Sequence, residues 1–352
     1  MRLAVDISPT LWLKPNGVEQ SITKVRAAEA AGFDTVWASE DPDGWDAFGA
    51  LAVLARETDQ IHLGTGVTNP YLRHPNLISA SVSTLDRSSN GRAFLGLGRG
   101  EPEWYRNAFG MELGSPLAHV EETVSLLRQW WGPDQTARGD GEIPVRDWRR
   151  AFPPLNAPPI YIAATGPKMQ RLAGRVADGV RFNRLASISF LKHAIATVRE
   201  GAGSANRNPA ELRVFAHPSL TITERDDQIE PVLEGMKTTI ALIHALPGMD
   251  KQLEGLESEF DIAAILERVR RHMRTDEILA RGGSFADLRL EGDLDAARKA
   301  IPTALVDRVA LVGPVERVLP RLAQYAEIGI TDVFANPDQI RDKEIIAQVR
   351  SL

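Results

Sequence analysis

The sequence predicts a (β/α)8 barrel, a fold in which a parallel sheet closes on itself and helices cover its outside. Short apolar runs, typical of strands buried on both faces, alternate with stretches of helical periodicity over most of the 352 residues. Glycine separates a helical stretch from the next apolar run at Gly32 and again at Gly329. The apolar runs number about eight, which favours a closed barrel. A doubly wound open sheet is the alternative.

The first half of the chain alternates strands and helices in order. We expect strands at residues 3–7, 33–38, 61–64 and 93–97. Helices are expected at 17–31, 46–57 and 77–87, and a further helix ends near Trp131. In the first of these helices apolar residues recur at helical spacing, and Gly32 provides a C-terminal stop.

The second half contains the remaining strands and a long helical segment. Strands are expected at 159–163, 180–183, 212–221 and 333–335, with a helix at 168–177. Residues 133–159, rich in proline, glycine and arginine, are expected to form a long loop near the site. Residues 225–304 are charged and helical, and the strand pattern resumes after them. We therefore expect one domain over residues 1–352 with a helical insertion after strand 7, which caps the ligand end or builds a subunit interface.

Composition and charge exclude several classes of protein. The chain has no cysteine, which excludes disulfides, thiolate metal sites and cysteine nucleophiles. Its formal net charge of −6 shows no excess of basic residues of the kind that binds nucleic acid. No cluster of residues has the spacing of zinc ligands. No apolar run approaches the roughly 20 residues that span a bilayer, and the first strand begins too early to leave room for a signal peptide. We expect a cytoplasmic protein that binds neither nucleic acid, membrane nor metal.

Three strand ends carry residues suited to ligand binding, because the carboxyl ends of parallel strands form the site in such folds. The first is the sequence GTGVTNPYLRHP at residues 64–75, where two glycines and two prolines bracket polar groups. Such a backbone favours an unusual conformation held against a ligand.

The second strand end is residues 160–169, where small residues lead through Gly166 and Pro167 into a helix. Proline suits the first helical position, and the free N–H groups there attract anions. Lys168 adds a positive charge, so this junction is a candidate phosphate site. An ordinary strand-to-helix turn is the alternative.

The third strand end runs through three alternating glycines to Glu101, a candidate proton donor if burial raises its pKa. A solvated loop acid is the alternative. The predicted second strand also ends in acids, of which Asp46 is expected to cap the next helix and Glu40 and Asp41 are candidates for catalysis. The alternative is a solvated, helix-capping cluster. Trp45 either stacks on a substrate or packs.

Residues 64–75, 84–93 and 160–169 together resemble the luciferase-like flavin and deazaflavin oxidoreductases, particularly the branch that uses coenzyme F420. Residues 68–71 and 73–75 are similar to methylene-tetrahydromethanopterin reductases. The resemblance covers residues 1–185 and resumes at 309–318.

The resemblance implies roles for particular residues in holding the cofactor. Residues at the second strand end would bind its phosphate; these are Ala164, Thr165, Gly166, Pro167, Lys168 and Met169. Gly66 and Val67 would form a bulge with a non-prolyl cis peptide behind the central ring, and Thr68 adjoins it. Arg99 stands where relatives often carry a small polar residue that touches the cofactor.

For catalysis, the resemblance implies that Glu101 is the proton donor, as in F420-dependent sugar-phosphate dehydrogenases. Relatives often have Asp-His where this chain has Glu40 and Asp41, so the histidine proposed as base is missing here. Arg73 and His74 are expected to contact the substrate or the cofactor tail, although a histidine before a proline is often structural.

We therefore expect a homodimeric F420-dependent oxidoreductase that exchanges a hydride with a small organic substrate, namely an imine, enone or alcohol, with a pterin-type molecule among the candidates. One alternative is a two-component FMN-dependent monooxygenase of the same fold, which would react with oxygen when its flavin is reduced. Another is a flavin-binding protein without catalytic activity.

Overall fold

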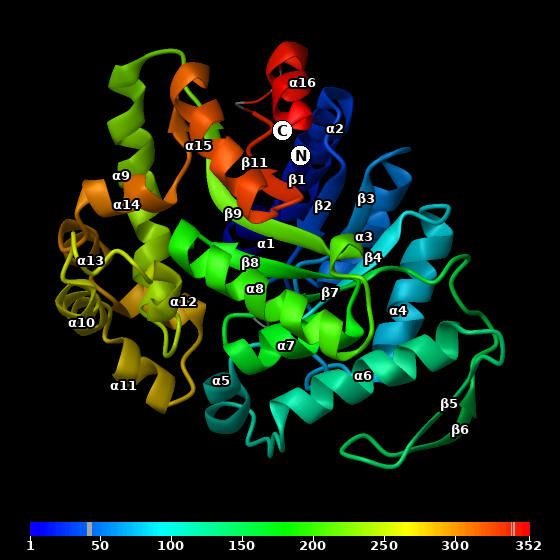
Figure 1. Ribbon diagram of the computed structural model, residues 1–352. Coiled ribbons are helices and arrows are strands. Elements are labelled where there is room, and N and C mark those ends of the chain that lie inside the picture. Colours follow the sequence, from blue (N-terminus) through cyan, green and yellow to red (C-terminus); the bar gives the residue numbers. More distant parts are fainter. Residues whose placement is uncertain (41–43, 339, 341) are drawn as a thin grey trace.

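The computed structural model describes residues 1–40, 44–338, 340 and 342–352 (Figure 1). Within these residues, eight parallel strands form a closed barrel: β1 (Arg2–Asp6), β2 (Thr35–Ala38), β3 (His62–Thr65), β4 (Ala93–Leu97), β7 (Ile160–Ala163), β8 (Gly179–Arg184), β9 (Arg213–Ile222) and β11 (Asp332–Ala335). They pair in that order, and β11 returns to β1 with Phe334 opposite Ala4. The predicted closed barrel is confirmed, and the open sheet is wrong.

Helices between the strands cover the outside of the barrel. They are α1 (Ser8–Leu13), α2 (Gly17–Ala31), α3 (Ala47–Arg56), α4 (Pro75–Ser88), α5 (Pro102–Asn107), α6 (Pro116–Trp131), α7 (Pro167–Val176), α8 (Ile188–Ser204), α15 (Val315–Ile328) and α16 (Lys343–Ser351). Gly32 and Gly329 end α2 and α15 at φ of 91° and 99°, a conformation that glycine adopts without strain. None of the helices in the described ranges is long and apolar enough to cross a membrane.

Aromatic side chains fill the inside of the barrel. The members of this layer are buried residues of different strands, namely Ala4, Trp37, Phe94, Tyr161, Phe215 and Phe334. The Trp37 ring centroid lies 4.4 Å from that of Phe94 and 4.7 Å from that of Phe215. The barrel is therefore a packed core, and polar groups at the carboxyl ends of the strands lie above this layer.

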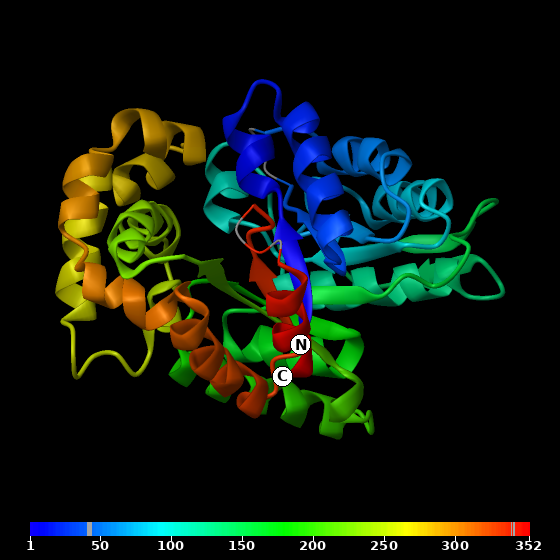
Figure 2. The same ribbon diagram turned by 90° about the horizontal axis from the view of Figure 1, so that it is seen from above.

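The chain between β9 and β10 (Val312–Gly313) is helical, as predicted. It contains η2 (Asp226–Gln228), α9 (Ile229–Thr239), the π-helix η3 (Ile240–His244), η4 (Asp250–Leu253), α10 (Ile262–Met273), α11 (Thr275–Ala280), α12 (Phe285–Glu291), α13 (Leu294–Lys299) and α14 (Thr303–Val309). Figures 1 and 2 show these helices gathered on one side of the barrel.

The helical insertion has its own hydrophobic cluster, which includes Trp104 and Tyr105 of α5 and Leu185 after β8. The Phe285 ring lies 6.3 Å from Trp12 and 4.8 Å from Trp104, measured between ring centroids. The insertion therefore packs on the carboxyl end of the barrel, the end at which the chain leaves β9 and enters the insertion. The assignment of residues 1–352 to a single domain stays a prediction.

The segment expected as a long loop near the site is a hairpin on the outside of the barrel. β5 (Thr136–Gly139) and β6 (Val145–Arg149) pair antiparallel and pack on α6, where Trp130 Nε1 donates to the Trp148 carbonyl at 2.9 Å. Only the tip approaches the carboxyl end, since Glu142 accepts from the backbone N–H of Ser115 at 2.9 Å. The short η1 (Pro209–Glu211) precedes β9.

Candidate active site

A β-bulge at the end of β3 shapes one side of the barrel mouth. Leu63 and Gly64 lie opposite Ala93 and Phe94, whereas Thr68 lies opposite Leu97, so β3 gains one residue over β4 in between. The bulge implied by the resemblance is present. The implied cis peptide is not, because no peptide bond among the described residues is cis.

Two glycines allow this bulge to form. A Cβ on Gly66 would lie 3.0 Å from Trp37 Cβ, and a Cβ on Gly98 would lie 2.8 Å from Val67 Cγ2. Thr68 then rejoins β4, since its N–H donates to Gly96 O at 3.0 Å and its carbonyl accepts from Gly98 N at 2.9 Å. The backbone at residues 66–68 is therefore held from both neighbouring strands.

Glu40, after β2, is tied to this bulge. Its N–H donates to Val67 O at 2.9 Å, and its carboxylate accepts hydrogen bonds from Thr68 Oγ1 and Arg73 Nε. Arg73 also pairs with Asp46, which caps α3 as predicted through the N–H of Gly49. Both oxygens of Glu40 are thus engaged. Asp41, the other carboxylate predicted for catalysis, lies outside the described residues.

Glu101 is a buried acid at the end of β4, with 7% of its surface exposed. Burial raises the pKa of Glu101 to about 8, and a hydrogen bond with Glu103 and the charge of Glu103 act in the same direction. The same hydrogen bond lowers the pKa of Glu103. The alternative of a solvated loop acid is wrong, because Glu101 is buried.

Gly100 lets the chain place Glu101 over the mouth. It has φ of 65°, and a Cβ there would lie 1.7 Å from Tyr105 Oη, so any side chain would clash with that ring. Arg99, which precedes it, is half-buried, and its charge lowers the pKa of Glu101 and Glu103. Arg99 therefore stabilises the ionised form of whichever acid has released its proton.

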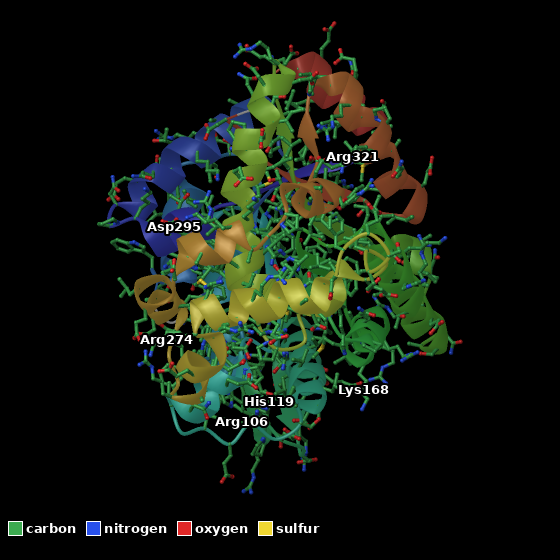
Figure 3. All side chains as sticks on the ribbon, turned by 90° about the vertical axis from the view of Figure 1, so that its left-hand side faces the viewer. Arg106, His119, Lys168, Arg274, Asp295 and Arg321 are labelled. Atoms are coloured by element: carbon green, nitrogen blue, oxygen red, sulfur yellow. The ribbon has the colours of Figure 1, made fainter. Side chains whose placement is uncertain are left out.

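The junction between β7 and α7 has the form expected of an anion site. Gly166 is the N-cap residue and Pro167 the first helical residue, so the helix begins as predicted. Because glycine carries no side chain to cap the helix, the N–H groups of Lys168 and Met169 point out of the helix end without a cap. A Cβ on Gly166 would meet no atom within 4 Å, which leaves open space beside these groups. Figure 3 shows Lys168 extending outward near this junction.

The two residues predicted to contact substrate lie at the rim of the mouth. Trp45 is 44% exposed, and its Nε1 donates to Lys14 O at 3.1 Å. His74 caps α4, because its Nδ1 accepts from the N–H of Asn76 at 3.1 Å. Burial lowers the pKa of His74, which favours the neutral ring that accepts this bond. Their roles toward a substrate stay predictions.

The structure adds a buried charge cluster that the sequence prediction missed. Its members are Asp6 of β1, Arg181 and Arg184 of β8 and His217 of β9, and we call them the mouth cluster. Arg181 Nη2 lies 3.2 Å from Asp6 Oδ2, and Arg184 Nε donates to His217 Nε2 at 2.8 Å. Charged residues inside strands predicted to be buried on both faces were the signal that could have found it.

Charge and packing fix the protonation states in the mouth cluster. Burial raises the pKa of Asp6, but the charges of Arg184 and Arg181 act in the opposite direction and hold it well below its usual range, so Asp6 is ionised. Burial, with the charge of Arg184, lowers the pKa of His217 to about 3, so its ring is neutral. The His217 ring stacks on Phe334 with centroids 4.6 Å apart.

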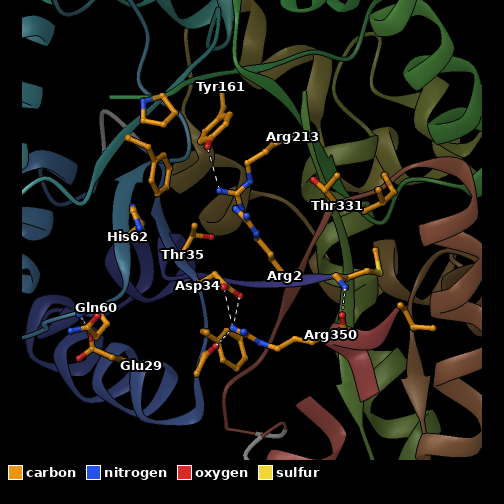
Figure 4. A pocket seen from close by; sticks show the side chains of 17 residues that line it. Arg2, Glu29, Asp34, Thr35, Gln60, His62, Tyr161, Arg213, Thr331 and Arg350 are labelled. Atoms are coloured by element: carbon orange, nitrogen blue, oxygen red, sulfur yellow. Dashed lines mark hydrogen bonds and ion pairs between the residues drawn. The ribbon is translucent and has the colours of Figure 1, made fainter. Parts of the chain in front are cut away.

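A cavity lies at the opposite end of the barrel. Its volume is about 1110 Å³, and it is lined by residues at the amino ends of the strands (Figure 4). Two arginines there are paired with carboxylates: Arg350 with Asp34, and Arg213 with Asp332, and Arg213 also donates to the Tyr161 hydroxyl. The amino end of such barrels serves stability, so we place the site at the mouth.

Comparison with known proteins agrees with the fold. The profile of the luciferase-like monooxygenases matches residues 7–332, and the chain belongs to this family. It is 30% identical to a 5,10-methylenetetrahydromethanopterin reductase of Methanolobus tindarius over 88% of this chain and 87% of that one. It is 29% identical to a putative coenzyme F420-dependent oxidoreductase of Mycobacterium tuberculosis, over 90% and 91%.

Solved structures share the fold. The F420-dependent tetrahydromethanopterin reductase from Methanopyrus kandleri superposes with a TM-score of 0.71 at 22% identity, covering 99% of this chain and 97% of that one. The family resemblance seen in residues 64–75 and 160–169 is thereby confirmed, as is the prediction that this chain is an enzyme.

Proposed function

We propose that this protein is a coenzyme F420-dependent oxidoreductase that transfers a hydride between the deazaflavin and a small organic substrate. The observation that carries the proposal is that Glu101, a buried carboxyl whose pKa is raised by burial, and the β3 bulge follow the neighbouring strands β4 and β3 at the same barrel mouth. Two of the similar proteins named above support the choice of cofactor, because coenzyme F420 stands in the names of the putative oxidoreductase of Mycobacterium tuberculosis and of the solved reductase from Methanopyrus kandleri.

The residues of the mouth suit such a cofactor. The bulge at Gly66, Val67 and Thr68 offers a rigid backbone surface for one face of a planar ring, because both neighbouring strands hold it. The start of α7 offers N–H groups, open space at Gly166 and the charge of Lys168 to a phosphate. When bound, the deazaflavin would supply or accept the hydride, and the protein would supply the rest.

Glu101 would supply the proton that accompanies the hydride. When a carbon of a C=O, C=N or C=C–C=O group receives a hydride, the electron pair of the double bond moves to the heteroatom or the adjacent carbon, which then needs a proton. Glu101 holds that proton at neutral pH because burial keeps its pKa near 8. After transfer the carboxylate faces Arg99, whose charge stabilises it. Solvent then returns the proton.

The other predicted residues would position these groups. Glu40 fixes Arg73 and the bulge through hydrogen bonds, so its proposed role is to hold the ends of β2 and β3. An imine of the pterin type is the substrate we propose first, because methylenetetrahydromethanopterin reductases are among the similar proteins.

Paired titrations test the choice of cofactor. Purified protein free of cofactor is titrated with F420 and, separately, with FMN, and binding is followed by fluorescence. Saturable binding of F420 with a Kd in the micromolar range or below, at least tenfold tighter than that of FMN, is the expected result. A preference for FMN would point to an oxygen-dependent monooxygenase, and the absence of binding of either would overturn the proposal. Gly166→Leu provides the matched control, since the side chain it adds would start in the open space beside the proposed phosphate site, where a Cβ meets no atom within 4 Å.

A further inference from the structure

The mouth cluster carries more positive than negative charge. Arg181 and Arg184 are cationic, Asp6 is ionised and His217 is neutral, so the four side chains sum to one positive charge. Lys24 donates to the backbone carbonyl of Asp6 at 3.2 Å and is itself faced by Asp338. An excess charge buried in a protein interior is unfavourable unless something compensates it. The excess at this mouth therefore favours an anionic ligand.

Two hydrogen-bond donors of the cluster have no acceptor among the described residues. Arg181 Nε is buried without a partner, and so is His217 Nδ1. Because His217 is neutral and its Nε2 accepts from Arg184, its proton resides on Nδ1, which is therefore a donor. Buried donors without acceptors are rare in native proteins, so each calls for a ligand or water.

Arg213, at the other end of the barrel, is an arginine that also lies over an aromatic ring but has acceptors for both Nε and Nη2. Its guanidinium lies over the Phe215 ring at 4.8 Å, as that of Arg181 lies over Phe334 at 5.0 Å. Arg213 gives Nε to Asp332 at 3.1 Å and Nη2 to the other oxygen of the same carboxylate, a bidentate pair. Arg181 donates to Asp6 through Nη2 alone. Its Nε has no acceptor among the described residues and can donate to another group.

The backbone around the cluster is distorted in a way that aims these side chains. The pairing of β8 with β9 shifts by one residue between Arg181 and Arg184. Leu185, which follows, is buried yet has φ of 56°, an unfavourable conformation for leucine. The insertion contributes a π-helix, from which His244 Nε2 donates to Arg184 O at 2.9 Å. Distortions of this kind persist where function requires them.

We propose that the mouth cluster binds a planar anion in which two neighbouring acceptor atoms share the negative charge. The proposal rests on the proposed function and deepens it. Two sources present this chemistry: the O=C–N⁻ edge of the reduced deazaflavin ring and the carboxylate of a substrate. Arg181 Nε, the exposed part of Arg184 and His217 Nδ1 are the donors, and Asp6 positions Arg181. The cluster shares the mouth with the β3 bulge and Glu101: β9, which carries His217, lies opposite β3 in the strand order, and β1 and β8 lie between these two strands on either side.

The test compares Arg184→Gln with Arg181→Lys and the control Arg213→Gln. Arg184 is 24% exposed, so its replacement disturbs packing least, and lysine at 181 keeps the charge but loses the fork of donors. Each variant is titrated with oxidised F420, with reduced F420, and with acetate and benzoate as carboxylate probes. Circular dichroism verifies that each variant is folded.

A cofactor site predicts that Arg184→Gln weakens binding of reduced F420 at least tenfold more than binding of oxidised F420. The midpoint potential of the bound cofactor would then fall by about 30 mV for a two-electron couple. A substrate site predicts an unchanged ratio but at least tenfold weaker binding of benzoate or acetate. Arg213→Gln should alter none of these affinities.

If neither Arg184→Gln nor Arg181→Lys changes the ratio or the carboxylate affinities, the anion site is refuted. Failure of the proposed function has a different signature: unmodified protein would not bind F420 at all, while the carboxylate titrations would still report on the cluster.

Discussion

The protonation of Glu101 can be tested through stability before any substrate is known. Burial raises the pKa of this carboxyl from 4.5 to about 8, so the folded protein binds a proton that the unfolded chain releases above pH 4.5. The stabilisation from that proton is complete below pH 4.5 and is lost as pH rises to about 8. At 1.36 kcal/mol for each pKa unit, the unmodified protein has lost roughly 3 kcal/mol of this contribution by pH 7.

Glu101→Gln imitates the protonated acid and cannot ionise. Its free energy of unfolding should therefore exceed that of the unmodified protein at pH 7 to 9 by roughly 3–5 kcal/mol, and the two should converge toward pH 4.5. Thermal or urea unfolding followed by circular dichroism across this pH range measures the difference. Equal stabilities at every pH would refute the view that Glu101 is protonated when the protein is folded.

Glu101→Gln should also turn over substrate much more slowly. Loss of a general acid typically lowers kcat by a factor of about 10²–10⁴, while affinity for F420 should be unchanged. In the unmodified protein kcat/KM should fall as pH rises through about 8, because the acid must be protonated to act. Glu103→Gln is the matched control: Glu103 helps to raise the pKa of Glu101, so its removal should move this fall to lower pH. A fall at the same pH would exclude Glu103 from the arrangement.

Three further substitutions address the bulge, the phosphate junction and the β2 edge. Gly166→Leu should weaken F420 binding at least tenfold without changing the melting temperature, since a Cβ there meets open space, and a normal Kd would remove the phosphate assignment. Gly98→Ala should lower the free energy of unfolding by about 1–3 kcal/mol, because the new Cβ would lie 2.8 Å from Val67 Cγ2. Adding Val67→Ala to this variant should restore part of the lost stability, and urea unfolding of both variants measures the difference. Arg73→Met leaves the Glu40 carboxylate with only the hydrogen bond from Thr68 and should destabilise the fold by roughly 1–3 kcal/mol, a loss that calorimetry would detect.

The sequence was sufficient to predict the barrel because its signals are local. Glycine stops such as Gly32 and Gly329, and apolar runs between them, report the strand and helix pattern directly. The second strand begins at Thr35 and not at residue 33, because Phe33 and Asp34 still belong to the turn after α2. The hairpin at residues 136–149 was missed because β6 is largely exposed and carries arginines, which obscures strand alternation.

The candidate site was predictable only where its residues adjoin in sequence. The bulge residues and the start of α7 each lie within one strand-to-helix junction, so composition revealed them. The mouth cluster could not be found in this way, since Arg181 and Asp6 are 175 positions apart and meet only when the barrel closes. Glu101 likewise adjoins α5, whose Trp104 and Tyr105 pack with the distant helical insertion, so its burial has no local signal.

Both chain ends lie together at the amino end of the barrel (Figure 2), where the N-terminal ammonium donates to Val349 O and Arg350 O at 3.1 Å. A tether attached at either end therefore leaves from the side opposite the mouth. Protein captured on a sensor surface by such a tether presents the bulge, Glu101 and the mouth cluster to the solution. The affinities discussed above can thus be measured on immobilised protein without the support blocking access.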